Sequence, residues 1–330
     1  MDVRTLAWGI LGTARINRAL IPPIRASARN RLAAVASRTP ERADLYAREW
    51  GIERSYGSYE ALLADPEIDV VFVPLPNALH APWAIRAVEA GKHVLCEKPL
   101  ATSVEDVRAI EAAARTHRRI VAEAFMYRHH PLTSAVAAAA RSGAIGELRL
   151  IRGWFSFVLD RPQDARWDPA MGGGSLWDVG CYPLSYARAV TGAEPVEVVG
   201  SRQSSPSGVD EVFTGLLRFP GRVQAVIDCS FTTPFQTGME LIGTAGRIVV
   251  RNPFKPGTES GYDLVTASGC DFVPVAGQEL YSGEVEDLAS AVLDGSLPRV
   301  TLADSRANVA AIEALYESAR IGRPVRPPVE

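Results

Sequence analysis

Apolar runs that alternate with helical patterns fill about the first 125 residues, and no other feature constrains the fold more. Residues with helix-capping side chains, Thr39, Ser58 and Ser103, stand before three of the helical patterns. This alternation predicts an α/β Rossmann domain with a doubly wound parallel sheet over residues 1–124. The carboxyl ends of its strands should line one crevice, where such sheets bind ligands. The apolar runs cover residues 6–11, 31–36, 69–76, 93–95 and 120–123.

Residues 125–330 predict a second domain of the α+β class. Short turns, such as Pro220-Gly221 and residues 244–246, separate several of its strand-like runs. Sequential strands joined by short turns imply a large, mostly antiparallel sheet. Helical patterns at 285–293 and 303–320 follow it. The strand-like runs cover residues 146–157, 196–199, 213–219, 223–231, 239–242 and 248–250.

Composition narrows the classes of function. The chain has 330 residues and a formal net charge of −3, which gives no electrostatic footprint for nucleic acid. The sequence contains no apolar run long enough for a membrane span and no visible export signal, so we expect a cytoplasmic protein. The adjacent His129 and His130 lack partners at ligand spacing, and we expect no metal site. Four widely spaced cysteines read as buried free thiols: Cys96, Cys181, Cys229 and Cys270.

The first apolar run ends at a glycine turn and leads into a helix, which is the context that a dinucleotide fingerprint requires. Gly12 fits the first position of G-x-G-x-x-G/A, whereas Ala14 and Asn17 replace the second and third glycines. The helix N-terminus would offer N–H groups to the phosphates. The alternative is a plain turn between strand and helix. The candidate cofactor-binding residues in this turn are Gly12, Thr13, Ala14, Arg15 and Ile16.

The end of the second run indicates which dinucleotide binds. NAD-binding Rossmann domains carry Asp or Glu there, to bind the ribose 2′-hydroxyl. This chain has Ser37 and Arg38, with Arg42 one helical turn later. Guanidinium groups bind a 2′-phosphate by charge-assisted hydrogen bonds, so the pattern favours NADP. The alternative is that both arginines are solvated residues at a helix start.

Two further loops follow strand ends. Lys98, within Cys96-Glu97-Lys98-Pro99, sits where such sheets place ligands, and Pro99 makes a cis Lys98–Pro99 bond possible. The alternative is an ordinary loop with a solvated lysine. His80 is interpreted as a cofactor-wall or structural histidine. The candidate cofactor-binding residues of the two loops are Pro74, Leu75, Pro76, Asn77, His80, Glu97 and Lys98.

A glycine-rich stretch in the second half carries further polar groups. A helix should begin near Ser175 and place Asp178 and Tyr182 on one face, behind the glycines 172–174. A carboxylate and a phenol beside a glycine cradle suit a polyhydroxylated substrate. The alternative is a buried tyrosine with a structural aspartate partner. Trp154, Trp167 and Trp177 offer stacking surfaces for a pyranose, although core packing is the expected role of at least two of them.

Together these segments resemble the glucose–fructose oxidoreductase, inositol dehydrogenase and rhizopine-catabolism (Gfo/Idh/MocA) family. The resemblance covers essentially the whole chain and rests on residues 8–16, 74–80, 97–99, 123–128 and 172–182. Inositol dehydrogenases carry histidine at the position of Tyr182. The chain is therefore nearer the branch with glucose–fructose oxidoreductase, dimeric dihydrodiol dehydrogenase, NADP-dependent xylose dehydrogenases and deoxysugar 3-ketoreductases.

The resemblance implies an NADP(H)-dependent oxidoreductase that moves a hydride between nicotinamide and a carbohydrate. It implies that Lys98 and Tyr182 are the catalytic pair, and that Arg166 and Asp178 contact the substrate, with Trp167 beside them. A lysine ammonium favours the phenolate form of a nearby tyrosine, which suits Tyr182 as general acid and base.

The family also implies homodimers or homotetramers built through the open face of the second-domain sheet. Three alternative substrates remain: a trans-dihydrodiol, a 1,5-anhydro-ketose or a nucleotide-linked ketosugar. A different class is an NADP-binding sensor without turnover, as fold alone does not decide function.

Overall fold

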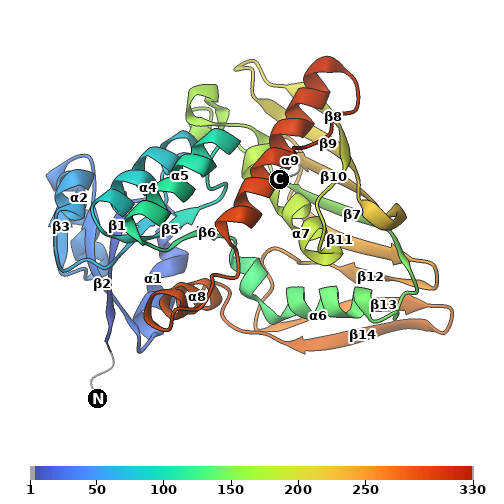
Figure 1. Ribbon diagram of the computed structural model, residues 1–330, viewed down its shortest axis with the longest axis horizontal. Helices are drawn as coiled ribbons and strands as arrows, with labels where there is room; N and C mark the ends of the chain where they lie inside the picture. The colour runs from blue at the N-terminus through green and yellow to red at the C-terminus, as the bar shows by residue number, and fades with distance from the viewer. Residues whose placement is uncertain (1–3, 329–330) are drawn as a thin grey trace. The chain divides into compact units, whose positions relative to one another are not determined.

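The computed structural model describes residues 4–328, which form two compact units (Figure 1). The first unit runs to Met126 and takes up Tyr281–Ser305. The second unit consists of Tyr127–Leu280 and the chain from Arg306 onward. Each unit is built around its own sheet.

The first unit contains a six-stranded parallel sheet in the order β3-β2-β1-β4-β5-β6. This order confirms the doubly wound α/β fold. Strand β3 was not predicted, because its three half-buried residues show no apolar run. The strands are β1 (Leu6–Leu11), β2 (Asn30–Ala36), β3 (Arg54–Tyr56), β4 (Val70–Val73), β5 (His93–Glu97) and β6 (Val121–Ala124).

The predicted caps begin three helices of this unit. The side chains of Thr39, Ser58 and Ser103 each accept a hydrogen bond from a backbone N–H in the first turn. Gly51 closes one helix in the left-handed conformation, with φ of 58°. Helices α4 and α5 lie side by side (Figure 1). The helices are α1 (Asn17–Ala26), α2 (Pro40–Trp50), α3 (Tyr59–Leu63), α4 (His80–Glu89), α5 (Val104–His117) and α8 (Ser282–Leu293), with a 3₁₀ turn at Asn77–Leu79.

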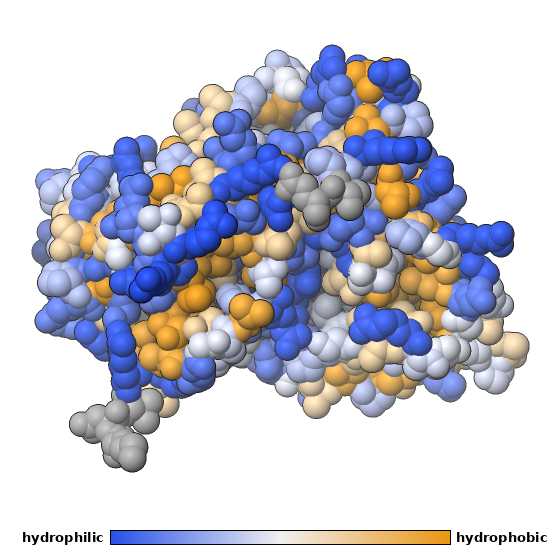
Figure 2. All heavy atoms as spheres, viewed as in Figure 1, coloured by the Kyte–Doolittle hydropathy of each residue, from blue (hydrophilic) through white to orange (hydrophobic). Residues whose placement is uncertain are grey.

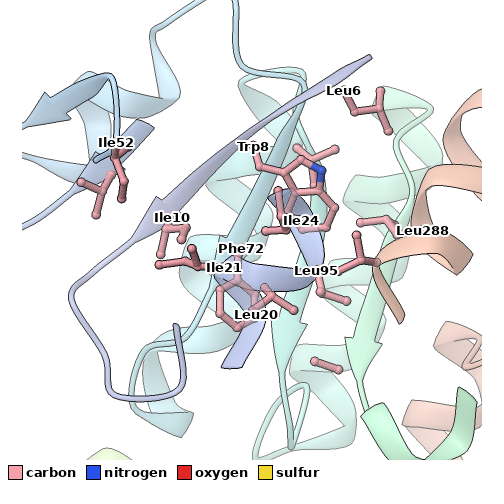
Figure 3. Packing of buried hydrophobic residues seen from close by; sticks show 14 of the residues in the cluster. Leu6, Trp8, Ile10, Leu20, Ile21, Ile24, Ile52, Phe72, Leu95 and Leu288 are labelled. Carbon is pink, nitrogen blue, oxygen red and sulfur yellow. The ribbon is translucent and has the colours of Figure 1, made fainter. Parts of the chain in front are cut away.

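Helix α8 belongs to the first unit, although the sequence analysis assigns it to the second domain. Its buried residues Val285, Leu288 and Ala289 join a cluster with Trp8 of β1 and Leu95 of β5 (Figure 3). Figure 3 shows Leu288 directed toward Leu95. The apolar face of α8 predicts a helix but does not specify which sheet it covers, so chain order gave the wrong domain.

Leu288→Ala is therefore expected to destabilise the first unit by about 2–5 kcal/mol, because it leaves a cavity in this cluster. Urea unfolding checks this prediction. Leu297→Ala is the matched control, since Leu297 is 84% exposed and its truncation should cost less than about 0.5 kcal/mol. Equal urea midpoints for the two variants would contradict the assignment of α8.

The second unit contains an eight-stranded sheet in the order β14-β13-β12-β11-β7-β10-β9-β8. Neighbouring strands are antiparallel except β10 and β7, which confirms the mostly antiparallel prediction. Strands β13 and β14 were not predicted, and most residues of the edge strand β14 are exposed, so no buried face marks it. The strands are β7 (Leu148–Ser156), β8 (Glu197–Ser204), β9 (Asp210–Arg218), β10 (Gln224–Ser230), β11 (Gln236–Gly243), β12 (Gly246–Val250), β13 (Glu259–Thr266) and β14 (Gly269–Ala276).

Helix α7 packs on β7 and β10 of this sheet, and α6 packs against α7 and β13. The helix predicted near Ser175 begins as a π-helical turn, Leu176–Gly180, and continues as α7. Helix α9 begins in the first unit and continues in the second. The helices are α6 (Pro131–Arg141), α7 (Cys181–Thr191) and α9 (Leu302–Ile321), with 3₁₀ turns at Met126–His129, Ala165–Trp167, Pro169–Met171 and Pro220–Arg222.

Three cysteines are buried free thiols as predicted, but Cys270 is exposed because it lies on the edge strand β14. His130 caps α6: its Nδ1 accepts from the Leu132 N–H, and its Nε2 faces the Gln278 N–H at 3.4 Å. Among residues 4–328, no helix is long and apolar enough to cross a membrane. The visible face of each unit is mostly hydrophilic, with small hydrophobic areas between (Figure 2).

Candidate functional site

The glycine turn after β1 is locked by its own hydrogen bonds. The Gly12 N–H donates to the Ala36 carbonyl at 2.8 Å, and the Asn17 amide donates to the Gly12 carbonyl at 3.0 Å. Gly12 has φ of +97°, and an added Cβ would lie 3.3 Å from Leu75 Cδ2. The turn therefore requires glycine there, whereas Asn17 holds the turn in place of the fingerprint's third glycine.

The N-terminus of α1 follows this turn without a side-chain acceptor, since Ile16 occupies the capping position. Its first N–H groups donate to backbone carbonyls of the turn itself, Asn17 to Ala14, Arg18 to Arg15 and Ala19 to Ile16. Thr13 and Ala14 are half-buried, and Arg15 is exposed. That this turn binds the diphosphate of a dinucleotide stays a prediction.

The structure brings the arginine cluster next to the glycine turn. Arg42 Nε donates to Thr13 Oγ1 at 2.9 Å, which joins the start of α2 to the turn after β1. Ser37 is buried, with its N–H donating to the Tyr56 carbonyl at 2.9 Å, and Arg38 is exposed beside it. Two guanidinium groups thus stand where an NAD-binding domain has a carboxylate.

Tyr59 belongs to this cluster and was missed by the sequence analysis. An added Cβ on Gly12 would lie 3.4 Å from the Tyr59 hydroxyl. Burial raises the pKa of Tyr59, and the nearby charges of Arg38 and Arg42 act in the opposite direction. Tyr59 follows the short strand β3. Had that strand been recognised, Tyr59 would have been noticed as a residue that follows a strand end.

His80 joins the two remaining loops of the first unit. Its Nδ1 lies 2.7 Å from the Pro99 carbonyl and its Nε2 2.6 Å from the Leu75 carbonyl. Burial lowers the pKa of His80 to about 4, and the Lys98 charge acts in the same direction. A neutral imidazole donates one hydrogen bond, so one of the two contacts is not a normal hydrogen bond. The geometry supports a structural role for His80, which holds the loops after β4 and β5 together.

The Lys98–Pro99 peptide bond is cis. Lys98 is half-buried at the end of β5, directly after Glu97. The next residue is fixed as well, because the Leu100 N–H donates to the buried Glu123 carboxylate at 2.8 Å. Lys98 thus projects from a backbone that is held on both sides. The loop residues Pro74, Leu75, Pro76 and Asn77 are buried or half-buried after β4.

In the second unit, Arg166 and Asp178 form a close ion pair. Arg166 Nε donates to Asp178 Oδ2 at 2.7 Å, and its Nη1 donates to Asp164 at 3.2 Å. The Asp178 carboxylate, followed by Asp164, raises the pKa of the Arg166 guanidinium. The pair presents a fixed donor and acceptor set that suits sugar hydroxyls.

The glycine cradle packs on the backbone of the Arg166 loop. The Gly173 N–H donates to the Asp168 carbonyl and the Gly174 N–H to the Arg166 carbonyl, both at 3.0 Å. An added Cβ on Gly173 would lie 2.4 Å from the Arg166 oxygen. The glycines therefore let two backbone segments approach each other. They would shape a ligand site only indirectly, by fixing the position of the Arg166 loop.

Tyr182 stands in an aromatic cluster and is 5% exposed. Its ring centroid lies 5.4 Å from Phe155, 5.4 Å from Phe254 and 5.8 Å from Tyr127. These rings fix the direction of the phenol, since large buried rings have little rotational freedom. The cluster was missed, because its members are far apart in the sequence.

Two of the three tryptophans have aromatic partners. Trp177 is 8% exposed and packs on Tyr316, with ring centroids 5.7 Å apart, so its role is in the core. Trp167 is half-buried beside Phe231, at 5.3 Å. Half-exposure at the Arg166 loop leaves Trp167 as a candidate substrate contact.

The predicted site residues thus fall into two sets. The cofactor set lies in the first unit, and the substrate set Arg166, Trp167, Asp178 and Tyr182 lies in the second. Lys98 belongs to the first unit and Tyr182 to the second, and their pairing stays a prediction.

Comparison with known proteins gives two family matches. Residues 6–125 match the oxidoreductase family with an NAD-binding Rossmann fold, and residues 133–249 match the GFO/IDH/MocA C-terminal domain. The chain is 39% identical over 324 residues to D-xylose 1-dehydrogenase (NADP(+)) 2 of Haloferax volcanii, covering 97% of this chain and 99% of the relative.

Two solved structures are similar over nearly the whole chain. One is a 3-ketoreductase from Actinomadura kijaniata in complex with NADP and TDP-benzene (TM-score 0.91, 30% identity, 96% of this chain and 98% of that chain). The other is aldose-aldose oxidoreductase from Caulobacter crescentus complexed with glycerol (TM-score 0.89, 30% identity, 98% of this chain and 100% of that chain).

Proposed function

Because this chain belongs to the Gfo/Idh/MocA oxidoreductase family, we propose that it is an NADP(H)-dependent oxidoreductase acting on a sugar or sugar-derived CH–OH or carbonyl group. The observation that carries the cofactor choice is the cluster after β2. Ser37, Arg38 and Arg42 stand where NAD-binding domains carry an acid, and Arg42 is already bound to Thr13. The xylose dehydrogenase relative, which is named for NADP⁺, supports this choice.

The residues that would hold the cofactor lie in the first unit. The glycine turn and the N-terminus of α1 would bind the diphosphate, and the arginine cluster the 2′-phosphate. When bound, the nicotinamide accepts a hydride from an alcohol carbon or gives one to a carbonyl carbon. His80 would keep the loops after β4 and β5 together as the cofactor wall.

Tyr182 would act as the general acid and base for the reacting oxygen of the substrate. In oxidation the phenolate oxygen of Tyr182 would take the hydroxyl proton of the substrate as the substrate carbon loses a hydride, and in reduction the resulting phenol would donate that proton to the carbonyl oxygen. The Lys98 ammonium would favour the phenolate form and orient the reacting hydroxyl. Arg166, Asp178 and Trp167 would bind the other hydroxyl groups of the sugar.

The test of this function is NADP⁺ reduction at 340 nm by the purified protein with a panel of free aldoses, and with NAD⁺ in parallel. We expect turnover of D-xylose or D-glucose with NADP⁺. Tight NADPH binding without turnover of any sugar would favour a reductase of a nucleotide-linked ketosugar or a non-catalytic sensor. Turnover of a trans-dihydrodiol or of a 1,5-anhydro-ketose alone would favour the corresponding relatives.

The arginine cluster yields a separate prediction. The double variant Arg38→Ala, Arg42→Ala is expected to raise the KM for NADP⁺ by about 10²-fold or more, because it removes two charge-assisted hydrogen bonds that each contribute about 1.5–3 kcal/mol. The KM for NAD⁺ should change by less than about threefold, since NAD⁺ has no 2′-phosphate. Arg48→Ala, at the other end of α2, is the control. An unchanged NADP⁺ KM in the double variant would refute the 2′-phosphate assignment.

We also propose that the protein forms a homodimer or homotetramer and is located in the cytoplasm. The strand β9 exposes Thr214, Leu216 and Arg218 on one face, which supports association through this sheet. The buried free thiols fit a reducing compartment. Light scattering coupled to size exclusion measures the assembly, and a monomer at micromolar concentration would refute it.

A further inference from the structure

A buried carboxylate outside the proposed catalytic residues holds the start of the substrate element. Asp210, the first residue of β9, is 1% exposed. Its Oδ2 accepts hydrogen bonds from Ser175 Oγ at 2.6 Å and from the Leu176 N–H at 2.8 Å. Its Oδ1 accepts from the Tyr316 hydroxyl of α9 at 2.6 Å. One side chain therefore ties the sheet, the glycine-rich turn and α9 together within the second unit.

The turn that Asp210 holds is the one from which the substrate residues project. Ser175 and Leu176 begin the π-helical turn that carries Asp178 and leads into α7 with Tyr182. The π geometry is visible at Cys181, whose N–H donates to the Leu176 carbonyl five residues earlier. Such turns deviate from the α-helix at a cost and need support from their surroundings.

Gly174 couples the same carboxylate to the Arg166 loop. It has φ of +124°, and an added Cβ would lie 2.2 Å from Asp210 Oδ1. Its N–H donates to the Arg166 carbonyl, while the Arg166 side chain binds Asp178. The carboxylate of Asp210 thus packs against Gly174, where the glycine-rich turn meets the Arg166 loop.

Packing alone does not explain a carboxylate at this place. Burying an ionised group costs free energy, and apolar side chains of similar size usually stabilise a core at least as well. Burial raises the pKa of Asp210, whereas the hydrogen bonds from Ser175, Tyr316 and Leu176 lower it. The carboxylate supplies acceptors at two oxygens at once, which an apolar residue cannot.

We propose that Asp210 is a positioning residue that anchors the π-helical turn, and so holds Asp178, its partner Arg166 and the following Tyr182 in their working geometry. This inference rests on the proposed sugar oxidoreductase function. Asp210 acts through the turn and touches no reacting atom in this scheme. Small displacements of positioned groups have large effects on rate, so its loss should appear in turnover.

The decisive variant is Asp210→Asn, which keeps the size of the side chain and places an amide where one of the two acceptor oxygens stands. We expect the turnover number with the best aldose to fall about tenfold or more, and the sugar KM to rise about threefold or more. The Kd for NADPH should stay within about twofold of the wild type, because the first unit is untouched. Hydrogen–deuterium exchange of residues 174–182 should accelerate about tenfold or more.

The matched control is Ser318→Ala. Ser318 is fully buried on the same helix as Tyr316, and its hydroxyl donates to the Arg323 carbonyl at 2.7 Å and accepts from the Gly200 N–H at 3.0 Å. Its loss removes two partly buried hydrogen bonds without touching the π-helical turn. We expect lower stability with an unchanged sugar KM and unchanged exchange in residues 174–182. If Asp210→Asn lowers stability but leaves turnover, the sugar KM and the exchange of residues 174–182 unchanged, the role of Asp210 is merely structural and the proposal is overturned.

Ser175→Ala decides the matter if Asp210→Asn does not fold. It removes one hydrogen bond to the carboxylate, and we expect the same changes at reduced size, about three- to tenfold in turnover. Wild-type turnover and exchange in Ser175→Ala would then overturn the proposal. If the wild-type protein turns over no sugar, the proposed function fails, and the exchange measurement still tests the anchoring by Asp210.

Discussion

Replacing Tyr182 by phenylalanine is expected to lower the turnover number for the sugar substrate by ~10²-fold or more, because general acid–base groups typically contribute 10²–10⁴-fold. The substitution removes one oxygen and keeps the ring. Phe155, Phe254 and Tyr127 therefore keep their packing partner, and we expect no loss of the second unit's fold. Steady-state kinetics at saturating NADP⁺, with circular dichroism of the variant, measure both effects.

Tyr186→Phe is the matched control for this prediction. Tyr186 is fully buried in the same aromatic cluster, with its ring 5.6 Å from Tyr127. Its hydroxyl has no hydrogen-bond partner among residues 4–328, so phenylalanine should be tolerated. We expect turnover within about twofold of the wild type for this variant. Near-normal turnover in Tyr182→Phe would refute the assignment of Tyr182, and an equal loss in both variants would point to packing instead.

Replacing Lys98 by alanine should also lower the turnover number by ~10²-fold or more, since in the proposed function it removes the cation that would favour the phenolate and orient the reacting hydroxyl. The backbone around Lys98 is held by Glu123 through Leu100 and by His80 through Pro99, so truncation of the side chain should leave the loop in place. NADPH binding, measured by fluorescence titration, should survive within about tenfold. Added primary amines are expected to restore part of the activity, because they return a cation to the space.

The double variant Lys98→Ala, Tyr182→Phe tests whether the two residues act on one proton transfer. If they do, the double variant should be about as active as the slower single variant, because catalytic groups that act as a unit are not additive. If the two losses multiply, the residues act independently and the proposed pair is wrong. Full turnover in Lys98→Ala alone would also refute the role of the lysine.

Local signals were reliable where a short segment sets its own structure. Thr39, Ser58 and Ser103 were predicted as helix caps from residues within one turn, and each accepts the expected bond. Local signals failed where neither face of a strand is fully buried. Strand β3 and the exposed edge strand β14 show no apolar period, and so they were missed.

The candidate site divides in the same way. Gly12, Arg38, Arg42 and Lys98 could be named from the sequence, because each follows a predicted strand end. The contact of Arg42 with Thr13 joins residues from two different strand ends, and the contact of Tyr316 with Asp210 spans 106 residues. No spacing rule gives such contacts, so Tyr59 and Asp210 entered the site only through the structure.

The sequence by itself determined the Rossmann fold, because strand period and helix caps are local properties. Its side-chain charges predict the ligand-binding edge and the binding of a 2′-phosphate. The tertiary structure decided which sheet α8 covers, which side chain Arg42 contacts at the glycine turn and which aromatic rings surround Tyr182. It also decided that the helix before Tyr182 begins as a π turn anchored by Asp210. These features depend on contacts between residues far apart in the chain, which form only when the unit that contains them has folded.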